Sequence, residues 1–210
     1  MNSKIKPAII SGDFNEIMYK IGVVDEFVEW VHLDVMDGKF ATSESWHSPD
    51  DLDILEGNTK LEIHLMIENP EDTLVYWTRV ADRVLVHYES TEHLENIFAS
   101  LEPHSTKLGL AVLLDTPLDK IKPYLVKIDF IQLMGIEKIG YHGQIFNSQV
   151  LERIKTLREM SPNATIQIDG GVTMETGKQC LEAGADILVV GSGIWQAQDH
   201  TGALQEFLKL

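Results

Sequence analysis

Cysteine is almost absent from the sequence, since Cys180 is the only one among 210 residues. A single cysteine excludes an intrachain disulfide and a zinc site built from thiolates. Cys180 lies in the helix-like run KQCLEAGAD, where we expect it to fill a small buried apolar position.

Long hydrophobic runs are also absent from the sequence. No stretch approaches the roughly 18 apolar residues that a membrane-spanning helix needs. The opening residues, MNSKIKPAII, have neither the apolar region nor the small-residue cleavage site of a signal peptide. We therefore expect a cytoplasmic protein with no membrane partner.

Basic side chains are scarce relative to acidic ones. Lysine and arginine number 17 against 33 aspartates and glutamates, which gives a formal charge of −16. Nucleic-acid binding depends mainly on basic side chains that neutralise phosphates, so this charge argues against a nucleic-acid partner. A small anionic ligand remains compatible with it, because backbone N–H groups can hold a phosphate.

What the sequence does contain is a regular alternation of short apolar runs with longer amphipathic segments. With 44% hydrophobic residues and this length, one domain with a substantial core is expected. The expected strands are 6–10, 30–34, 61–65, 83–87, 107–113, 129–134, 165–169 and 186–190. The expected helices are 15–27, 70–80, 92–101, 118–124, 148–160, 173–183 and 202–210, with 41–57 the weakest helical segment.

Strands that are each followed by a helix-like segment imply parallel pairing with right-handed crossovers. Near-continuous apolar strands fit a sheet that is covered on both faces. Eight such units predict a (β/α)8 TIM barrel that forms a single domain over residues 1–210. An open doubly wound sheet is the alternative, but it usually has fewer strands.

Polar side chains close several of the expected strands. His32 and Asp34 alternate on one strand and therefore share a face. His64 and Asp169 end two other strands, and in such barrels these ends meet at one mouth. Two imidazoles and two carboxylates at one mouth predict a site for a divalent transition metal.

Each of these residues also has an ordinary structural explanation. A lone buried histidine such as His32 is more often a hydrogen-bonded core residue, and Asp169 could organise the turn at the glycines after it. The four together favour the site. We interpret His87 as a residue behind the ligands or in the core, Asp37 as a turn residue with Gly38, and His142 as a further candidate in a glycine-rich loop.

Glycine-rich loops follow the last three expected strands. In IDGGVT, Gly170 and Gly171 allow close backbone approach, and Thr173 can cap the next helix. The run VVGSGIW (189–195) precedes a short helix. Loops after strands seven and eight are the recurrent phosphate site of these barrels, so they predict phosphate binding. In the third loop, GIEKIGYHGQIF (135–146), Gly140 alone reads as a turn glycine.

The motifs taken together resemble the ribulose-phosphate 3-epimerase family over most of the chain. The resemblance is carried by PAIISGDF (7–14), HLDVMDG (32–38), HLM (64–66), VHYE (86–89), the 134–144 loop, DGGV (169–172) and VVGSGIW (189–195). It implies a (β/α)8 epimerase that inverts C3 of a ketose phosphate, D-ribulose 5-phosphate to D-xylulose 5-phosphate, through a metal-stabilised cis-enediolate. The implied cofactor is one divalent ion of zinc, iron, manganese or cobalt, the implied partner is the phosphorylated ketose, and we expect a homo-oligomer.

The resemblance also implies roles for individual residues. The metal ligands would be His32, Asp34, His64 and Asp169, with Asp34 and Asp169 also the acid/base pair on opposite faces of the sugar. The lining of the reacting carbon would be Met36, Met66 and Met134. The substrate phosphate would lie among Gly143, Gln144, Gly170, Gly171, Gly191 and Ser192.

Four segments depart from the family pattern. Ala8 stands where the family usually has serine, and residues 41–48 (ATSESWHS) replace a segment that normally reads like FVPN. IGYHGQ (139–144) replaces PGFGGQ, and Leu114-Asp115 replaces asparagine-proline. These departures leave two alternatives open: an epimerase for another ketose phosphate such as D-allulose 6-phosphate, or a non-catalytic phosphosugar-binding relative.

Overall fold

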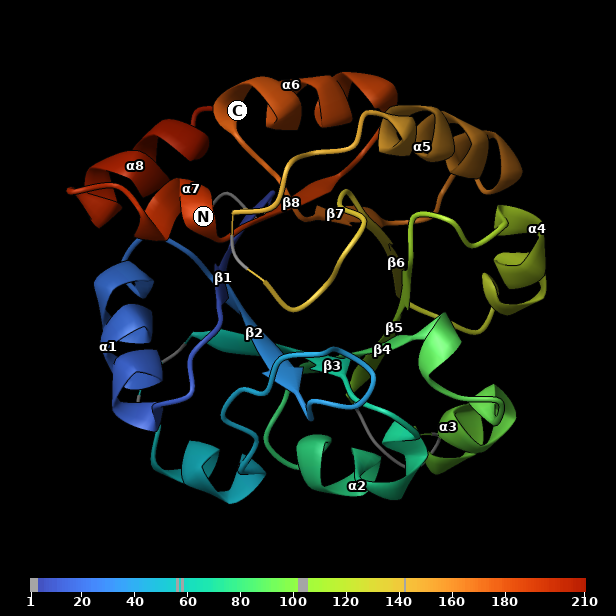
Figure 1. Ribbon diagram of the computed structural model, residues 1–210, viewed down its shortest axis with the longest axis horizontal. Helices are drawn as coiled ribbons and strands as arrows, with labels where there is room; N and C mark the ends of the chain where they lie inside the picture. Colours follow the sequence, from blue (N-terminus) through green and yellow to red (C-terminus); the bar gives the residue numbers. More distant parts are fainter. Residues whose placement is uncertain (1–3, 56, 58, 102–105, 142) are drawn as a thin grey trace.

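The computed structural model describes residues 4–55, 57, 59–101, 106–141 and 143–210. Within these residues eight parallel strands pair in sequence order, and β8 pairs with β1 to close a barrel (Figure 1). The predicted (β/α)8 fold class is confirmed. The strands are β1 (Ile5–Ile9), β2 (Trp30–Met36), β3 (Lys60–Met66), β4 (Arg83–His87), β5 (Lys107–Val112), β6 (Phe130–Met134), β7 (Ile166–Asp169) and β8 (Ile187–Val190).

The helices lie around the outside of the barrel (Figure 1). The α-helices are α1 (Phe14–Val24), α2 (Leu74–Trp77), α3 (Leu94–Leu101), α4 (Leu118–Ile121), α5 (Gln149–Met160), α6 (Met174–Ala183), α7 (Ser192–Trp195) and α8 (His200–Phe207). Short 3₁₀ helices are η1 (Pro49–Ile54), η2 (Pro70–Asp72), η3 (Tyr88–Ser90) and η4 (Lys122–Tyr124). As predicted, Thr173 caps α6, where its side chain accepts from the N–H of Thr176.

Several expected helices are shorter than their sequence pattern. The segment 70–80 splits into η2 and α2, because Thr73 between them does not have helical dihedrals. Helix α4 gives way to η4 where Pro123 follows, since proline has no N–H to donate to the preceding turn. In the described part of segment 41–57, the helical residues are those of the 3₁₀ helix η1. Among the described residues, no helix combines the length and the apolar character needed to cross a membrane.

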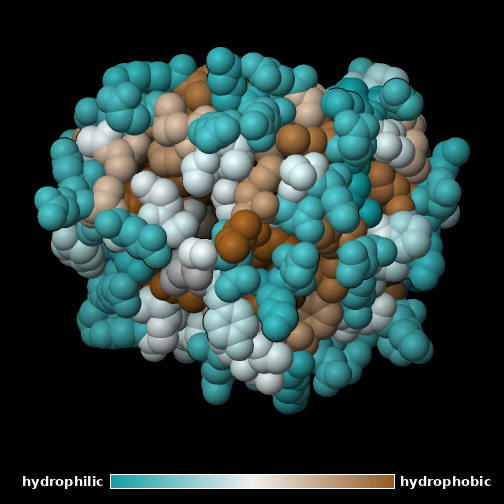
Figure 2. All heavy atoms as spheres, turned by 45° about the horizontal axis from the view of Figure 1, so that its top comes forward, coloured by the Kyte–Doolittle hydropathy of each residue, from teal (hydrophilic) through white to brown (hydrophobic). Residues whose placement is uncertain are grey.

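Side chains of β2 point alternately to the hydrophobic core outside the barrel and to the barrel interior. Val31, Leu33 and Val35 are buried in the main hydrophobic core together with residues of the surrounding helices. The intervening residues of the same strand therefore face the barrel interior. Cys180 on α6 belongs to that core and is fully buried, as predicted. The face shown in Figure 2 carries mainly hydrophilic side chains, with hydrophobic ones gathered near its middle.

Strand register places candidate site residues of neighbouring strands side by side. Asp34 pairs with His64 across β2 and β3, and Met36 pairs with Met66. Across β6 and β7, Met134 pairs with Asp169. Strand β2 ends two residues later than expected and β3 ends one residue later, so Met36 and Met66 are strand residues. The segment between β6 and α5, yellow in Figure 1, lies over the barrel opening.

Candidate active site

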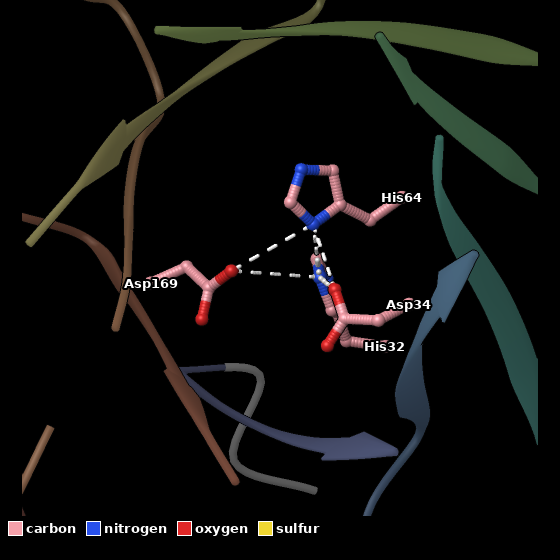
Figure 3. A group of neighbouring side chains, drawn as sticks. All are labelled: His32, Asp34, His64 and Asp169. Atoms are coloured by element: carbon pink, nitrogen blue, oxygen red, sulfur yellow. Dashed lines mark hydrogen bonds and ion pairs between the residues drawn. The ribbon is translucent and has the colours of Figure 1, made fainter. Parts of the chain in front are cut away.

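Four side chains from three strands point toward one another inside the barrel mouth (Figure 3). His32 and Asp34 come from β2 and His64 from β3, while Asp169 reaches in from β7 on the opposite wall. One ligand atom of each lies within 4.8 Å of all the others. The structure therefore brings together all four residues that the sequence assigns to a metal.

The spacing of these atoms suits a divalent metal ion. Bonds of about 2.0–2.1 Å to a tetrahedral zinc ion place neighbouring ligand atoms about 3.3 Å apart. His32 Nε2 lies 3.2 Å from His64 Nδ1 and 3.3 Å from Asp34 Oδ1. Asp169 Oδ2 is 3.9 Å from His32 Nε2 and 3.7 Å from His64 Nδ1. A nitrogen and oxygen donor set of this size fits zinc, iron, manganese or cobalt.

The outer nitrogens of both imidazoles are held by other buried side chains. His32 Nδ1 donates to Glu62 Oε1 at 2.8 Å, since a carboxylate can only accept. His64 Nε2 lies 2.9 Å from His87 Nε2, and His87 Nδ1 is 3.4 Å from Glu89 Oε2. His87 thus lies behind His64 rather than among the four central atoms. Such contacts leave His32 Nε2 and His64 Nδ1 facing the centre, as metal-ligating histidines require.

The two aspartates have opposite electrostatic environments. Burial disfavours the charge of Asp34, but His32 and His64 outweigh it and hold the pKa of its carboxyl well below the usual range. Burial and the neighbouring charge of Asp34 raise the pKa of Asp169 to about 7. Near neutral pH the pair therefore combines an ionised carboxylate with a carboxyl group that can carry a proton, the arrangement typical of acid/base pairs.

The histidines also differ in charge. Burial opposes protonation of His32, but the carboxylates of Asp34 and Glu62 prevail and raise its pKa to about 10. Burial lowers the pKa of His87 to about 4, with the neighbouring His64 acting in the same direction. His87 is therefore neutral near pH 7 and can act as a hydrogen-bond partner of His64.

Asp34 and Asp169 both line one cavity at the barrel mouth. Met66 and Met134 line it, while Met36 packs beside them in the same apolar cluster. The glycine-loop residues assigned to phosphate also line it: Gly143, Gln144, Gly170, Gly171, Gly191 and Ser192. The two aspartates and the candidate phosphate residues thus share one cavity.

Comparison with known proteins agrees with this arrangement. A family model described as "Ribulose-phosphate 3 epimerase family" matches residues 4–195. The chain belongs to the ribulose-phosphate 3-epimerase family. This confirms the resemblance predicted from the motifs, and with it the prediction of an epimerase enzyme.

Individual relatives of this family member cover almost its whole length. Ribulose-phosphate 3-epimerase from Synechocystis sp. is 33% identical, covering 97% of this chain and 92% of the relative. The enzyme of the same name from Bacillus subtilis is 31% identical over 97% of both chains. Among solved structures, the tryptophan synthase A-subunit of Pyrococcus furiosus has a TM-score of 0.76, with 14% identity over 99% of this chain and 97% of the subunit. That likeness shows the fold alone.

Two segments that depart from the family pattern contact each other at the mouth. Thr42, after β2, shares a hydrogen bond of 2.6 Å with the hydroxyl of Tyr141, after β6. Ser43 donates to the carbonyl of Gly140 at 2.5 Å. The β2 loop itself turns at Asp37 as predicted, because Asp37 Oδ1 accepts from the N–H groups of Lys39 and Phe40. His142, the further candidate of this family member, lies outside the described residues.

The glycines after β7 are required by close packing. Gly171 has a φ of +68°, and a Cβ there would meet the backbone of Phe146. Gly170 has a φ of +101°, and its Cβ would meet Ile136. Both positions suit glycine, since other residues rarely adopt such dihedrals. The β6–α5 segment of this family member can therefore lie directly against the β7 loop.

A set of buried polar residues below the mouth was not predicted as part of the site. Each is almost fully buried, and the set is Lys6, Glu62, Gln132 and Gln167. Their sequence positions could have indicated this set. Each of the four lies two residues before a residue of the cavity lining or of the candidate metal site. Residues two apart on a strand share a face, so all four face the interior of this epimerase-family barrel.

Proposed function

We propose that the protein is a metal-dependent epimerase that inverts C3 of a ketose phosphate, D-ribulose 5-phosphate to D-xylulose 5-phosphate. The observation that supports this most strongly is the convergence of Asp34 and Asp169 from opposite walls of the barrel on two histidines. His32, Asp34, His64 and Asp169 would hold the divalent cation, which when bound acts as a Lewis acid toward negative charge on the substrate oxygens.

The two carboxylates supply the proton transfers of the reaction. Inversion of a carbon beside a ketone requires removal of its proton from one face and delivery of a proton to the other. Ionised Asp34 takes the C3 proton, which leaves a planar cis-enediolate, and protonated Asp169 delivers its proton to the opposite face. In the reverse direction the two residues exchange roles.

The cavity lining supports the planar intermediate and the phosphate. Thioethers of Met36, Met66 and Met134 can pack against a flat enediolate without competing as acids or bases. The glycine loops after β7 and β8 expose backbone at the cavity, where a phosphate binds in many barrels of this fold. We assign phosphate contacts to Gly143, Gln144, Gly170, Gly171, Gly191 and Ser192.

The identity of the sugar depends on the segments that depart from the family pattern. Ala8 and Tyr141 both line the cavity. The contacts Thr42–Tyr141 and Ser43–Gly140 join the two altered loops at the mouth. D-Allulose 6-phosphate is therefore the second candidate substrate. Assaying the metal-loaded protein on pentulose and hexulose phosphates and comparing kcat/KM separates the two.

Proton exchange at C3 tests the proposed reaction directly. Metal-loaded protein in D₂O is expected to place deuterium at C3 of its substrate, and failure to label any ketose phosphate in the panel would refute epimerisation. Tight phosphosugar binding without exchange would instead favour a non-catalytic relative. The variants Asp34→Asn and Asp169→Asn are expected to abolish exchange, with metal content measured in each.

The matched control for these variants is Asp119→Asn, which makes the same change at an exposed position on α4. It is expected to exchange C3 at the wild-type rate. The expected homo-oligomer remains a prediction, and light scattering on the purified chain would measure its mass in solution.

A further inference from the structure

Beneath the candidate metal centre the barrel interior is polar. Lys6 and Glu62 are exposed by 1% and 0%, and Gln132 and Gln167 are fully buried. We call these four side chains the interior polar layer; they come from β1, β3, β6 and β7. Interior positions of such barrels are usually filled by bulky branched apolar residues, so this layer needs an explanation.

The donor and acceptor of each hydrogen bond within the layer can be assigned, starting from Lys6. The ammonium of Lys6 can only donate, and it donates to Glu62 Oε2 and, at 2.7 Å, to Gln167 Oε1. The Gln167 amide must then present its NH₂ group on the other side. That group donates to Gln132 Oε1 and to Glu62 Oε1, each at 2.6 Å. Lys6 therefore fixes the orientation of both neighbouring side chains.

Both ends of the layer reach candidate metal ligands. Gln132, whose oxygen already accepts from Gln167, donates through Nε2 to Asp169 Oδ2 at 3.1 Å. Asp169 Oδ2 is the oxygen that faces the two imidazoles. At the other end, Glu62 Oε1 accepts from His32 Nδ1 at 2.8 Å, which leaves His32 Nε2 toward the centre. One hydrogen-bonded layer thus connects a ligand on β2 with a ligand on β7.

Stability alone does not account for this arrangement. A buried ion pair such as Lys6–Glu62 loses the hydration of both charges, and apolar replacements of similar volume are often neutral or stabilising. The layer is instead suited to orientation, because Gln132 holds Asp169 and Glu62 holds His32, while the remaining bonds hold Gln132 and Glu62 in place. Mutation of residues that orient metal ligands in this way commonly lowers metal affinity by roughly 10–100-fold.

We propose that the interior polar layer positions His32 and Asp169 for the divalent cation, with Glu62 and Gln132 as the positioning residues and Lys6 as the group that orients them. This inference rests on the proposed metal-dependent function. It assigns to these residues no contact with substrate. Its consequence is that metal affinity and coordination depend on side chains that lie below the ligands.

The test is a Co(II) titration of the full chain in competition with a chelating dye, combined with the cobalt absorption spectrum. Gln132→Met removes the donor to Asp169 while keeping volume and charge. We expect the Kd for Co(II) to rise about 10–100-fold and the cobalt bands to shift. At saturating Co(II), kcat should fall while KM changes little, because Asp169 is also the proposed proton donor.

The control is Gln179→Met, the same substitution at an exposed position on α6, which should leave the Kd, spectrum and kcat unchanged. The double variant Lys6→Met/Glu62→Gln removes both buried charges together and should also weaken Co(II) binding. Should Gln132→Met fail to fold, Gln132→Asn keeps the amide but shortens its reach, and the same changes are expected.

The outcomes separate the two proposals. If the wild type binds Co(II) and folded variants bind it with the same Kd and spectrum, the positioning role is overturned and the proposed function stands. If the folded variants lose only thermal stability, the layer is structural and the inference is again overturned. If the wild type itself does not bind Co(II), the metal-dependent function fails and this inference fails with it.

Discussion

The raised pKa of Asp169 predicts that stability of the chelator-treated protein depends on pH in a specific direction. In the folded chain this pKa is about 7, against an ordinary value of 3.8. Between these values the folded protein holds a proton that the unfolded chain has released. A raised carboxyl pKa therefore stabilises the fold fully below about pH 4, and this stabilisation is lost as the pH rises to about 7.

The size of the effect follows from the pKa difference. Each pKa unit corresponds to 1.36 kcal/mol, so the shift amounts to about 4 kcal/mol. Asp169→Asn keeps the shape of the side chain but cannot release this proton. We expect the free energy of unfolding of the wild type to fall by about 4 kcal/mol relative to the variant between about pH 4 and pH 8.

Equilibrium urea unfolding of both proteins with EDTA, at a series of pH values, measures this difference. Subtracting the variant curve removes the contribution of titrating groups that do not interact with Asp169. Asp119→Asn, at an exposed position, is the control and should follow the wild-type curve. Parallel wild-type and Asp169→Asn curves would refute the reasoning, because they would mean that Asp169 titrates alike in the folded and unfolded chains.

Three further predictions concern the metal, the barrel interior and the thiol. Saturation to 100 times Kd with Zn(II) should stabilise the chain by about 2.7 kcal/mol, or about 5–10 °C in Tm. Calorimetry should detect no such shift in His64→Ala, while the exposed His93→Ala should keep it. A Cβ at Gly109 would overlap Phe130 and Leu85, so Gly109→Ala should cost about 1–3 kcal/mol in urea unfolding. Gly22→Ala on α1, where nothing lies within 4 Å, should instead gain about 0.5–1 kcal/mol. Burial raises the pKa of the Cys180 thiol to about 12, so a thiol reagent at about pH 8 should label it only after unfolding.

The site residues on strand ends were predictable from local pattern. His32, Asp34 and Met36 alternate along β2, and alternation places residues on one face whatever the rest of the chain does. The eight strand-and-helix repeats then predict that strand ends share a mouth. The sequence pattern therefore places His32 and Asp34 at the same mouth as His64 and Asp169. The distances among these residues were not predictable, because they depend on how the closed barrel staggers its strands.

The interior polar layer was only partly predictable from the sequence. Glu62 precedes His64 by two residues and Gln167 precedes Asp169 by two, so their direction into the barrel was implied by the strands. Their partners were not implied. Lys6 on β1 reaches Gln167 on β7 only because β8 closes against β1. The shortened helices η2–α2 and α4–η4 likewise depended on packing and on Pro123 rather than on apolar periodicity.

The order of the elements, the face on which each polar residue lies and the family to which the motifs belong all follow from the sequence. These properties are local, since they follow from the two-residue period of strands and from short motifs. The pKa values of Asp34 and Asp169, by contrast, depend on the tertiary structure. Asp34 and Asp169 are the same residue type at the ends of strands. Asp34 contacts two imidazoles and stays ionised, whereas partial burial and the charge of Asp34 raise the pKa of Asp169 to about 7.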